Sequence, residues 1–209
     1  MNCSINISLN NAGKRFNRDW VFKNFSYQFI SGKHYAITGP NGSGKSTLLQ
    51  IIAGSTQTSE GTIQYKIQDA NTTIASENIF QSIALVAPYI ELIEEMTITE
   101  FLKFHEVFKK FVLPVHDIIT AIGLENAATK QIRYYSSGMK QRVKLAQAIF
   151  SNTPIVLLDE PCTNLDSVGY QLYHQLLQQY GHNKTIIISS NDENEISFCS
   201  ERINMSALK

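Results

Sequence analysis

One stretch of this 209-residue chain decides its fold class: Gly39-Pro40-Asn41-Gly42-Ser43-Gly44-Lys45-Ser46-Thr47. It matches the pattern G-x-x-x-x-G-K-[ST]. The apolar run Tyr35–Thr38 before it is typical of a strand. From about Lys45 to Ala53 the spacing predicts a helix, which Gly54 would end as a C-terminal cap. A glycine-rich loop between a strand and a helix is the context that makes this pattern specific.

The residue types of this loop point to a bound triphosphate, which needs many hydrogen-bond donors in a small volume. Glycines at 39, 42 and 44 let the backbone curl with its N–H groups inward. The start of the following helix adds free N–H groups and a positive dipole end. We expect Lys45 to reach the β and γ phosphates and Ser46 to bind Mg²⁺. The alternative, a glycine-rich turn that contains a lysine by chance, leaves the flanking strand and helix unexplained.

A second candidate site lies where the apolar run Ile155–Leu158 ends in Asp159 and Glu160. In a parallel sheet this edge faces the ligand crevice. We expect Asp159 to hold Mg²⁺ and Glu160 to orient the attacking water. A solvated acidic turn after a strand is the competing interpretation, and the phosphate loop elsewhere in the chain favours the functional one.

The rest of the chain predicts an α/β fold. Apolar and polar residues alternate around 5–9 and 25–29, as in half-buried antiparallel strands, whereas the apolar runs 155–158 and 185–189 suit strands of a parallel sheet. Helices are expected from Thr97, where Glu100 completes a capping box, and at about 116–122, 138–149 and 168–180. We expect one domain over 1–209, with a core at 1–88 and 150–209 and a small helical subdomain at about 89–149.

Composition limits the partners of the chain. Lys+Arg and Asp+Glu both number 18, so we expect no nucleic-acid partner. We find neither a membrane-spanning apolar run nor a signal peptide, and we therefore expect a cytoplasmic protein. Cys3, Cys162 and Cys199 lack metal-ligand spacing and are expected to be free thiols.

Two further motifs carry a family resemblance. The segment Tyr135–Arg142 (YSSGMKQR) resembles the LSGGQ-x-Q-R signature of ATP-binding cassette proteins, and Asn164-Leu165-Asp166 is similar to the D-loop of that family. All four motifs occur in the order of the family and together span nearly the whole chain. The resemblance implies a P-loop NTPase core and an ATPase, here of the compact, single-cassette type found as subunits of transporters.

The resemblance also implies partners. Two cassettes, identical or different, would form a head-to-tail dimer that encloses ATP and Mg²⁺, with Ser136 and Gly138 of one subunit binding the γ-phosphate held by the other. Phe16 matches the aromatic residue that stacks on adenine, although a core phenylalanine is an alternative and Trp20 a second candidate. An integral membrane permease on a separate chain would be the driven partner, which would place this subunit on the cytoplasmic face of the membrane.

Three departures from the family concern positions expected to lie near Mg²⁺ or phosphate. Pro88 stands where a glutamine usually contacts Mg²⁺, Asn191 where a histidine contacts the γ-phosphate, and Ser137 where the signature has a glycine. Asparagine still donates a hydrogen bond but, unlike histidine, cannot take up or release a proton near neutral pH. We therefore expect slow hydrolysis, with Glu160 and Asn191 as its catalytic residues. A regulatory module that binds ATP and barely hydrolyses it is the alternative function.

The loop that begins at Pro88 is a candidate surface for binding a partner protein. Pro88–Met96 lies where the family couples nucleotide state to its membrane partner, and its Tyr89 and Ile93 would suit a groove for a partner helix. Packing against the helical subdomain is an equal alternative.

Overall fold

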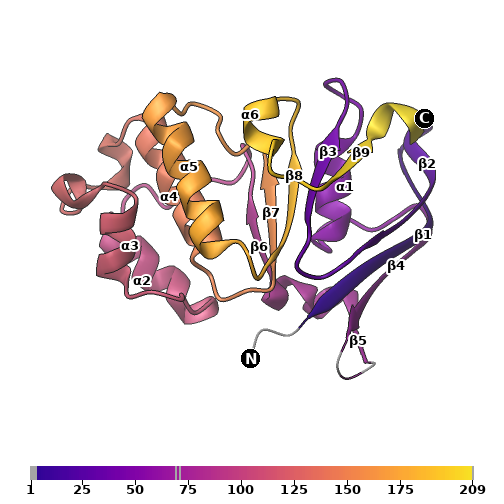
Figure 1. The fold of residues 1–209 in the computed structure, drawn as a ribbon, viewed down its shortest axis with the longest axis horizontal. Coiled ribbons are helices and arrows are strands. Elements are labelled where there is room, and N and C mark those ends of the chain that lie inside the picture. Colours follow the sequence, from indigo (N-terminus) through magenta and orange to yellow (C-terminus); the bar gives the residue numbers. More distant parts are fainter. Residues whose placement is uncertain (1–3, 69, 71, 209) are drawn as a thin grey trace.

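A computed structural model describes residues 4–68, 70 and 72–208 of the chain. Its described strands form two sheets (Figure 1). The four-stranded antiparallel sheet has the order β2-β1-β4-β5, from β1 (Ile5–Phe16), β2 (Asp19–Phe29), β4 (Glu60–Ile67) and β5 (Thr73–Ile74). The five-stranded sheet has the order β6-β7-β8-β3-β9, from β3 (His34–Thr38), β6 (Ile83–Val86), β7 (Ile155–Asp159), β8 (Thr185–Ser189) and β9 (Glu201–Asn204).

All neighbouring strands of the larger sheet are parallel. Every residue of β7 and β8 is buried, as expected for strands whose two faces are both covered. In β7, Val156 and Leu158 face one hydrophobic core, and Ile155 and Leu157 face another. The parallel sheet thus separates two cores, and the predicted α/β fold with antiparallel strands at its start is confirmed.

The helices are α1 (Lys45–Ile52), α2 (Ile98–Phe108), α3 (Val115–Ala121), α4 (Ser137–Ile149), α5 (Ser167–Tyr180) and α6 (Glu193–Ile196). Short 3₁₀ segments are η1 (Ser76–Ser82), η2 (Glu125–Ala127), η3 (Ile132–Tyr134) and η4 (Met205–Leu208). Figure 1 shows α2 and α3 at the end of the molecule opposite β1, β2 and β4. Among the described residues, no helix has the length and apolarity to cross a membrane.

Local signals place several helix ends where the sequence predicts them. Thr97 accepts a hydrogen bond from the backbone N–H of Glu100 (3.3 Å), and the Glu100 carboxylate accepts one from the backbone N–H of Thr97 (2.8 Å). This is the predicted capping box at the start of α2. After α1, Gly54 has a left-handed φ of 73°. Cys162 and Cys199 are buried free thiols, and Cys3 lies outside the described residues.

Candidate nucleotide site

The glycine-rich loop leaves the carboxyl end of β3 and turns into α1, with three glycines in the left-handed region. Their φ angles are 138° at Gly39, 76° at Gly42 and 99° at Gly44. A Cβ on Gly44 would lie 2.3 Å from Cγ1 of Val21, and one on Gly39 would lie 2.8 Å from Oγ of Ser43. The loop path therefore requires glycine at 39 and 44 for space as well as for conformation.

Polar groups inside the loop are available to an anion. Gly44 is the N-cap of α1 and supplies no side-chain oxygen, so the first N–H groups of the helix keep their donor capacity. Oγ of Ser43 is buried and has no hydrogen-bond partner within the described part of the chain. Nζ of Lys45 donates to the carbonyl oxygens of Gly39 (2.7 Å) and Pro40 (3.3 Å), which holds the ammonium group against the loop. These donors and the cradle that glycine leaves open fit a phosphate group.

A cavity of about 410 Å³ opens beside the loop. It is lined by Phe16, Val21, Asn41, Gly42, Gly44, Lys45, Ser46, Thr47 and Glu160. The structure thus brings Phe16, Glu160 and most residues of the phosphate loop to one place. The other predicted site residues do not line this cavity: Gly39, Pro40, Ser43, Ser136, Gly138, Asp159 and Asn191. The side chain of Phe16 is 51% exposed, and Nζ of Lys14 lies 4.9 Å from the centroid of its ring.

Trp20, the second candidate for adenine stacking, is not among the lining residues of this cavity. Two cations approach its ring, with Nζ of Lys23 at 4.5 Å and Cζ of Arg15 at 5.5 Å from the centroid. These contacts place Trp20 in a cationic cluster of the hairpin between β1 and β2, and Phe16 is the better placed of the two aromatic residues.

The two acids after β7 lie in different environments. Asp159 is the last residue of the strand and is 3% exposed, whereas Glu160 is exposed and lines the cavity. The backbone of Glu160 is left-handed, with φ 45°, and its N–H donates to the carbonyl oxygen of Ser189 (2.9 Å). The edge of the sheet after β7 therefore carries one buried carboxylate, Asp159, and one exposed carboxylate, Glu160.

The acidic edge also includes a side chain that sequence reasoning assigned elsewhere. Burial raises the pKa of Tyr89, the Asp159 carboxylate raises it further, and the Gln50 side chain opposes both effects. These effects indicate that Tyr89 lies toward Asp159 and α1, whereas the sequence suggested either a partner-facing residue or one that packs against the helical subdomain. No motif marks this position, because the contact depends on the turn after β6, where the N–H of Ile90 donates to the carbonyl oxygen of Ala87 (3.1 Å).

The donor chemistry at this edge fits a magnesium ion. The Ser46 hydroxyl and the Asp159 carboxylate are hard oxygen ligands of the kind Mg²⁺ prefers. Across residues 4–68, 70 and 72–208, no group of three or more His, Cys, Asp or Glu side chains is arranged to hold a metal ion. Mg²⁺ usually takes one or two carboxylate ligands and the rest from phosphate and water.

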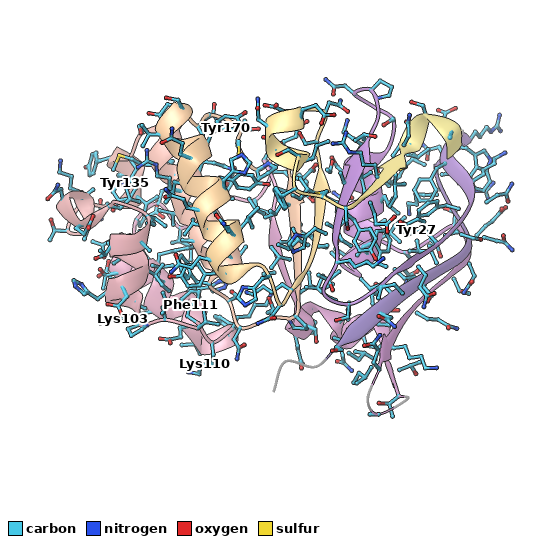
Figure 2. The ribbon with its side chains drawn as sticks, in the orientation of Figure 1. Tyr27, Lys103, Lys110, Phe111, Tyr135 and Tyr170 are labelled. Carbon is cyan, nitrogen blue, oxygen red and sulfur yellow. The ribbon has the colours of Figure 1, made fainter. Side chains whose placement is uncertain are left out.

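The signature segment lies apart from the phosphate loop. Ser136 is the N-cap of α4, and its Oγ accepts a hydrogen bond from the N–H of Met139 (3.2 Å). Ser136, Ser137 and Gly138 line a separate cavity of about 490 Å³, which also includes Lys130, Arg142 and Asn164. Tyr135, directly before this segment, and Tyr27 of β2 lie toward opposite ends of the molecule (Figure 2). The two cavities share no lining residue.

Two of the three positions that depart from the family, Asn191 and Pro88, each form a hydrogen bond that involves a backbone atom. Asn191 follows β8, and its Oδ1 accepts a hydrogen bond from the N–H of Gly39 (3.0 Å). Pro88 follows β6, and its carbonyl oxygen accepts one from Nζ of Lys144 (3.4 Å). Asn191 is therefore in contact with the phosphate loop, whereas Pro88 is tied to α4.

Comparisons with known proteins agree with this geometry. The sequence model of the family described as "ABC transporter" matches residues 22–163, more than half of the chain. An uncharacterized ABC transporter ATP-binding protein of Bacillus subtilis, YybJ, is 34% identical over 95% of this chain and 92% of its own length. The sulfate/thiosulfate import ATP-binding protein CysA of Photorhabdus laumondii is 30% identical over 95% of this chain, which spans 57% of that protein.

Solved structures give the same result. The dimeric post-hydrolysis structure of the ATP-binding cassette MJ0796, bound to ADP and Pi, is 27% identical with a TM-score of 0.81 and covers 97% of this chain and 94% of its own. An ATP-binding protein of an ABC transporter from Pyrococcus furiosus has the same fold, with a TM-score of 0.80 at 20% identity over 98% of this chain and 99% of its own. The chain therefore belongs to the ATP-binding cassette family of ABC transporter ATP-binding proteins.

Proposed function

We propose that this chain is the ATP-binding and ATP-hydrolysing subunit of an ABC transporter. ATP-driven closure of a cassette dimer would then act on a separate membrane permease, with this subunit on the cytoplasmic face of the membrane. The observation that carries the proposal is the cavity beside the phosphate loop, which gathers Phe16, Lys45, Ser46 and Glu160 around one opening. Base stacking, phosphate binding and water activation would thus be served at a single place.

In this proposal the loop binds the triphosphate through its backbone N–H groups, the hydroxyl of Ser43 and the ammonium group of Lys45. Ser46 and Asp159 would hold Mg²⁺, which neutralises phosphate charge when bound. Phe16 stacks on adenine at the open side of the cavity, where half of its surface is accessible. These residues account for binding and orientation.

Glu160 is the proposed catalytic carboxylate. It faces the cavity from the strand end and would orient and deprotonate the attacking water. Asn191 is the proposed donor to the γ-phosphate. Because Oδ1 of Asn191 accepts from Gly39, its Nδ2 group is the part left to donate. Asn191 has no titratable proton near neutral pH, and Pro88 has no side-chain amide to support the water, so we propose that turnover is slow.

The separation of the two cavities supports the proposed dimer. Ser136 and Gly138 lie at the start of α4, where a helix N-terminus, a hydroxyl and a backbone N–H would form an anion site. Within one chain this site shares no lining residue with the phosphate-loop cavity. We therefore propose that it binds the γ-phosphate of ATP held by a second cassette.

The test compares ATP hydrolysis by the wild type, Glu160→Gln and Lys45→Ala. We expect measurable wild-type turnover, an ATP-bound dimer that accumulates in Glu160→Gln, and loss of ATP binding in Lys45→Ala. The dimer is measured by gel filtration with and without ATP. Wild-type turnover no faster than that of Glu160→Gln would contradict the proposal, and so would ATP affinity unchanged in Lys45→Ala.

A further inference from the structure

Three elements hold the short segment that follows β7. The N–H of Glu160 donates to the carbonyl oxygen of Ser189 (2.9 Å). Nε2 of Gln141 on α4 donates to the carbonyl oxygen of Pro161 (2.6 Å), and Oε1 of Glu195 on α6 accepts from the N–H of Cys162 (2.9 Å). The backbone is therefore fixed at Glu160 and at each of the two residues after it.

Gln141 and Glu195 are buried polar residues whose hydrogen bonds serve this segment. They are 7% and 3% exposed. A buried polar group is costly unless it is hydrogen-bonded, so its partner is informative. Both side chains form hydrogen bonds with backbone groups of the two residues that follow Glu160. The carbonyl of Pro161 accepts and the N–H of Cys162 donates, which fixes the amide nitrogen of Gln141 and a carboxylate oxygen of Glu195 toward them.

The backbone of Glu160 has a conformation that needs support from its surroundings. Its φ of 45° is left-handed, which is uncommon for a residue with a side chain. Glu160 also precedes Pro161, and a residue before proline favours extended backbone. Strained conformations of this kind persist where surrounding contacts determine them, and they occur often at functional sites.

We propose that Gln141 and Glu195 are positioning residues for Glu160: their hydrogen bonds to Pro161 and Cys162 hold the strained backbone that directs the Glu160 carboxylate into the nucleotide cavity. This inference rests on the proposed ATPase function. It also gives α4 two tasks, because the helix that begins with the signature residues Ser136 and Gly138 supports Glu160 of its own chain through Gln141.

Gln141 and Glu195 need different hydrogen-bonding groups, one a donor and the other an acceptor, and this difference supplies a matched control variant. Gln141 must donate, so Gln141→Met removes the contact at nearly constant shape. Glu195 must accept, so Glu195→Met removes the contact whereas Glu195→Gln keeps an acceptor oxygen. Burial raises the pKa of Glu195. Hydrogen bonding to Ser190 and to the N–H of Cys162 opposes this rise, and Asp192 and Glu160 add to it. The net rise in the pKa agrees with a neutral isostere being tolerated at this position.

The experiment measures kcat, KM and nucleotide affinity for these variants in two backgrounds, wild type and Glu160→Gln. In the wild-type background we expect Gln141→Met and Glu195→Met to lower kcat about tenfold, a part of what a general base contributes. Their affinity for ATP, measured with a fluorescent analogue, should stay within about twofold, and Glu195→Gln should stay close to the wild type. In the Glu160→Gln background the same substitutions should cause no further loss.

Several outcomes would overturn the proposal. A loss of equal size in both backgrounds, or a loss in affinity with kcat unchanged, would mean that the two residues act on the fold alone. Wild-type kcat in both methionine variants, beside a large loss in Glu160→Gln, would overturn the positioning role and leave the ATPase function standing. Equal turnover of the wild type and Glu160→Gln would overturn both. Should the methionine variants fold poorly, Gln141→Asn and Glu195→Asp shorten the side chains, keep their polarity and carry the same expectations.

Discussion

Oδ1 of Asn191 accepts a hydrogen bond from the backbone N–H of Gly39 at 3.0 Å, joining the end of β8 to the first residue of the phosphate loop. Because a backbone N–H donates only, this contact fixes the orientation of the amide and leaves Nδ2 as its free donor. Asn191 thus supports the loop with one atom and has a second for a ligand. A histidine ring at this position would bring a proton that asparagine lacks.

We expect Asn191→His to raise turnover, because an imidazole adds a titratable donor near the γ-phosphate. The increase should be about threefold to tenfold in kcat, a modest part of a general acid–base contribution. Steady-state ATP hydrolysis measures it. As a control, Asn191→Asp keeps the acceptor for Gly39 and adds a negative charge beside phosphate. This variant should therefore weaken the binding of ATP more than the binding of ADP. Equal kcat in Asn191→His and wild type would contradict the role proposed for this position.

Phe16 and Trp20 give a paired test of adenine stacking. Phe16 lines the cavity and Trp20 does not, so Phe16→Leu should weaken ATP binding by about 1 kcal/mol, roughly fivefold in Kd. Phe16→Trp should restore affinity, and Trp20→Leu should leave it unchanged. Titration with a fluorescent ATP analogue provides the measurement. A larger loss in Trp20→Leu than in Phe16→Leu would reverse the assignment.

Sequence alone predicts the parts of this site whose signal is local. The glycines of the phosphate loop, the buried strand before Asp159 and the capping box at Thr97 each depend on residues within a few positions of one another, and the structure places them as expected. Local spacing and backbone chemistry are sufficient for such features.

Other features depend on which segments meet in space. The bond from Gln141 to Pro161 and the bond from Glu195 to Cys162 join residues 20 and 33 positions apart, and no pattern in either segment indicates them. The choice between Phe16 and Trp20 as the adenine-stacking residue depends on how the hairpin between β1 and β2 lies relative to the phosphate loop, which the sequence does not indicate. The edge strand β9 was not predicted because its four residues carry little periodic signal.

Two glycines with similar φ angles allow the cost of backbone strain to be measured separately from the cost of steric crowding when each is replaced by alanine. Gly32 has φ 78° and Gly44 has φ 99°. A Cβ added at Gly32 would have no atom within 4 Å, whereas one added at Gly44 would lie 2.3 Å from the side chain of Val21. Gly32→Ala should therefore cost about 1–2 kcal/mol of unfolding free energy and leave ATP affinity unchanged. Gly44→Ala should cost more and weaken ATP binding at least about tenfold, since the loop must move. Urea unfolding and ATP titration measure both, and wild-type affinity in Gly44→Ala would argue against the loop as the site.

The loop Pro88–Met96 is the proposed contact for a membrane partner. Tyr89 and Ile93 are exposed, which leaves their apolar surface available to a partner helix. Tyr89→Ser with Ile93→Ser should lower the fraction of the chain that sediments with membranes of the expressing cells, and purified protein should keep its ATP affinity. Because Tyr89 also lies near Asp159, Tyr89→Phe is the control for effects at the nucleotide. An unchanged membrane fraction in the double variant would remove this surface from the proposal.

We expect His105 to make the stability of the chain depend on pH. Burial, with the nearby Lys109 charge, lowers the pKa of His105 from 6.5 to about 4. Its ring stacks on Phe111 at 5.4 Å, a residue labelled in Figure 2, and Nε2 lies 3.3 Å from Oγ of Ser151. Between pH 6.5 and about 4 the unfolded chain therefore binds a proton that the folded chain excludes.

The unfolding free energy should consequently fall as pH drops through this window, and the full contribution of the neutral ring should be present above it. His105→Gln keeps a hydrogen-bonding side chain for Ser151 and removes the titration, so its stability should fall less between about pH 7 and about pH 5. Urea unfolding of both proteins at the two pH values measures the difference. Substitution of the exposed His116 by glutamine is the matched control for exchanging a histidine elsewhere in the helical region. Equal pH dependence in the wild type and His105→Gln would show that His105 takes up its proton equally well in the folded and unfolded states.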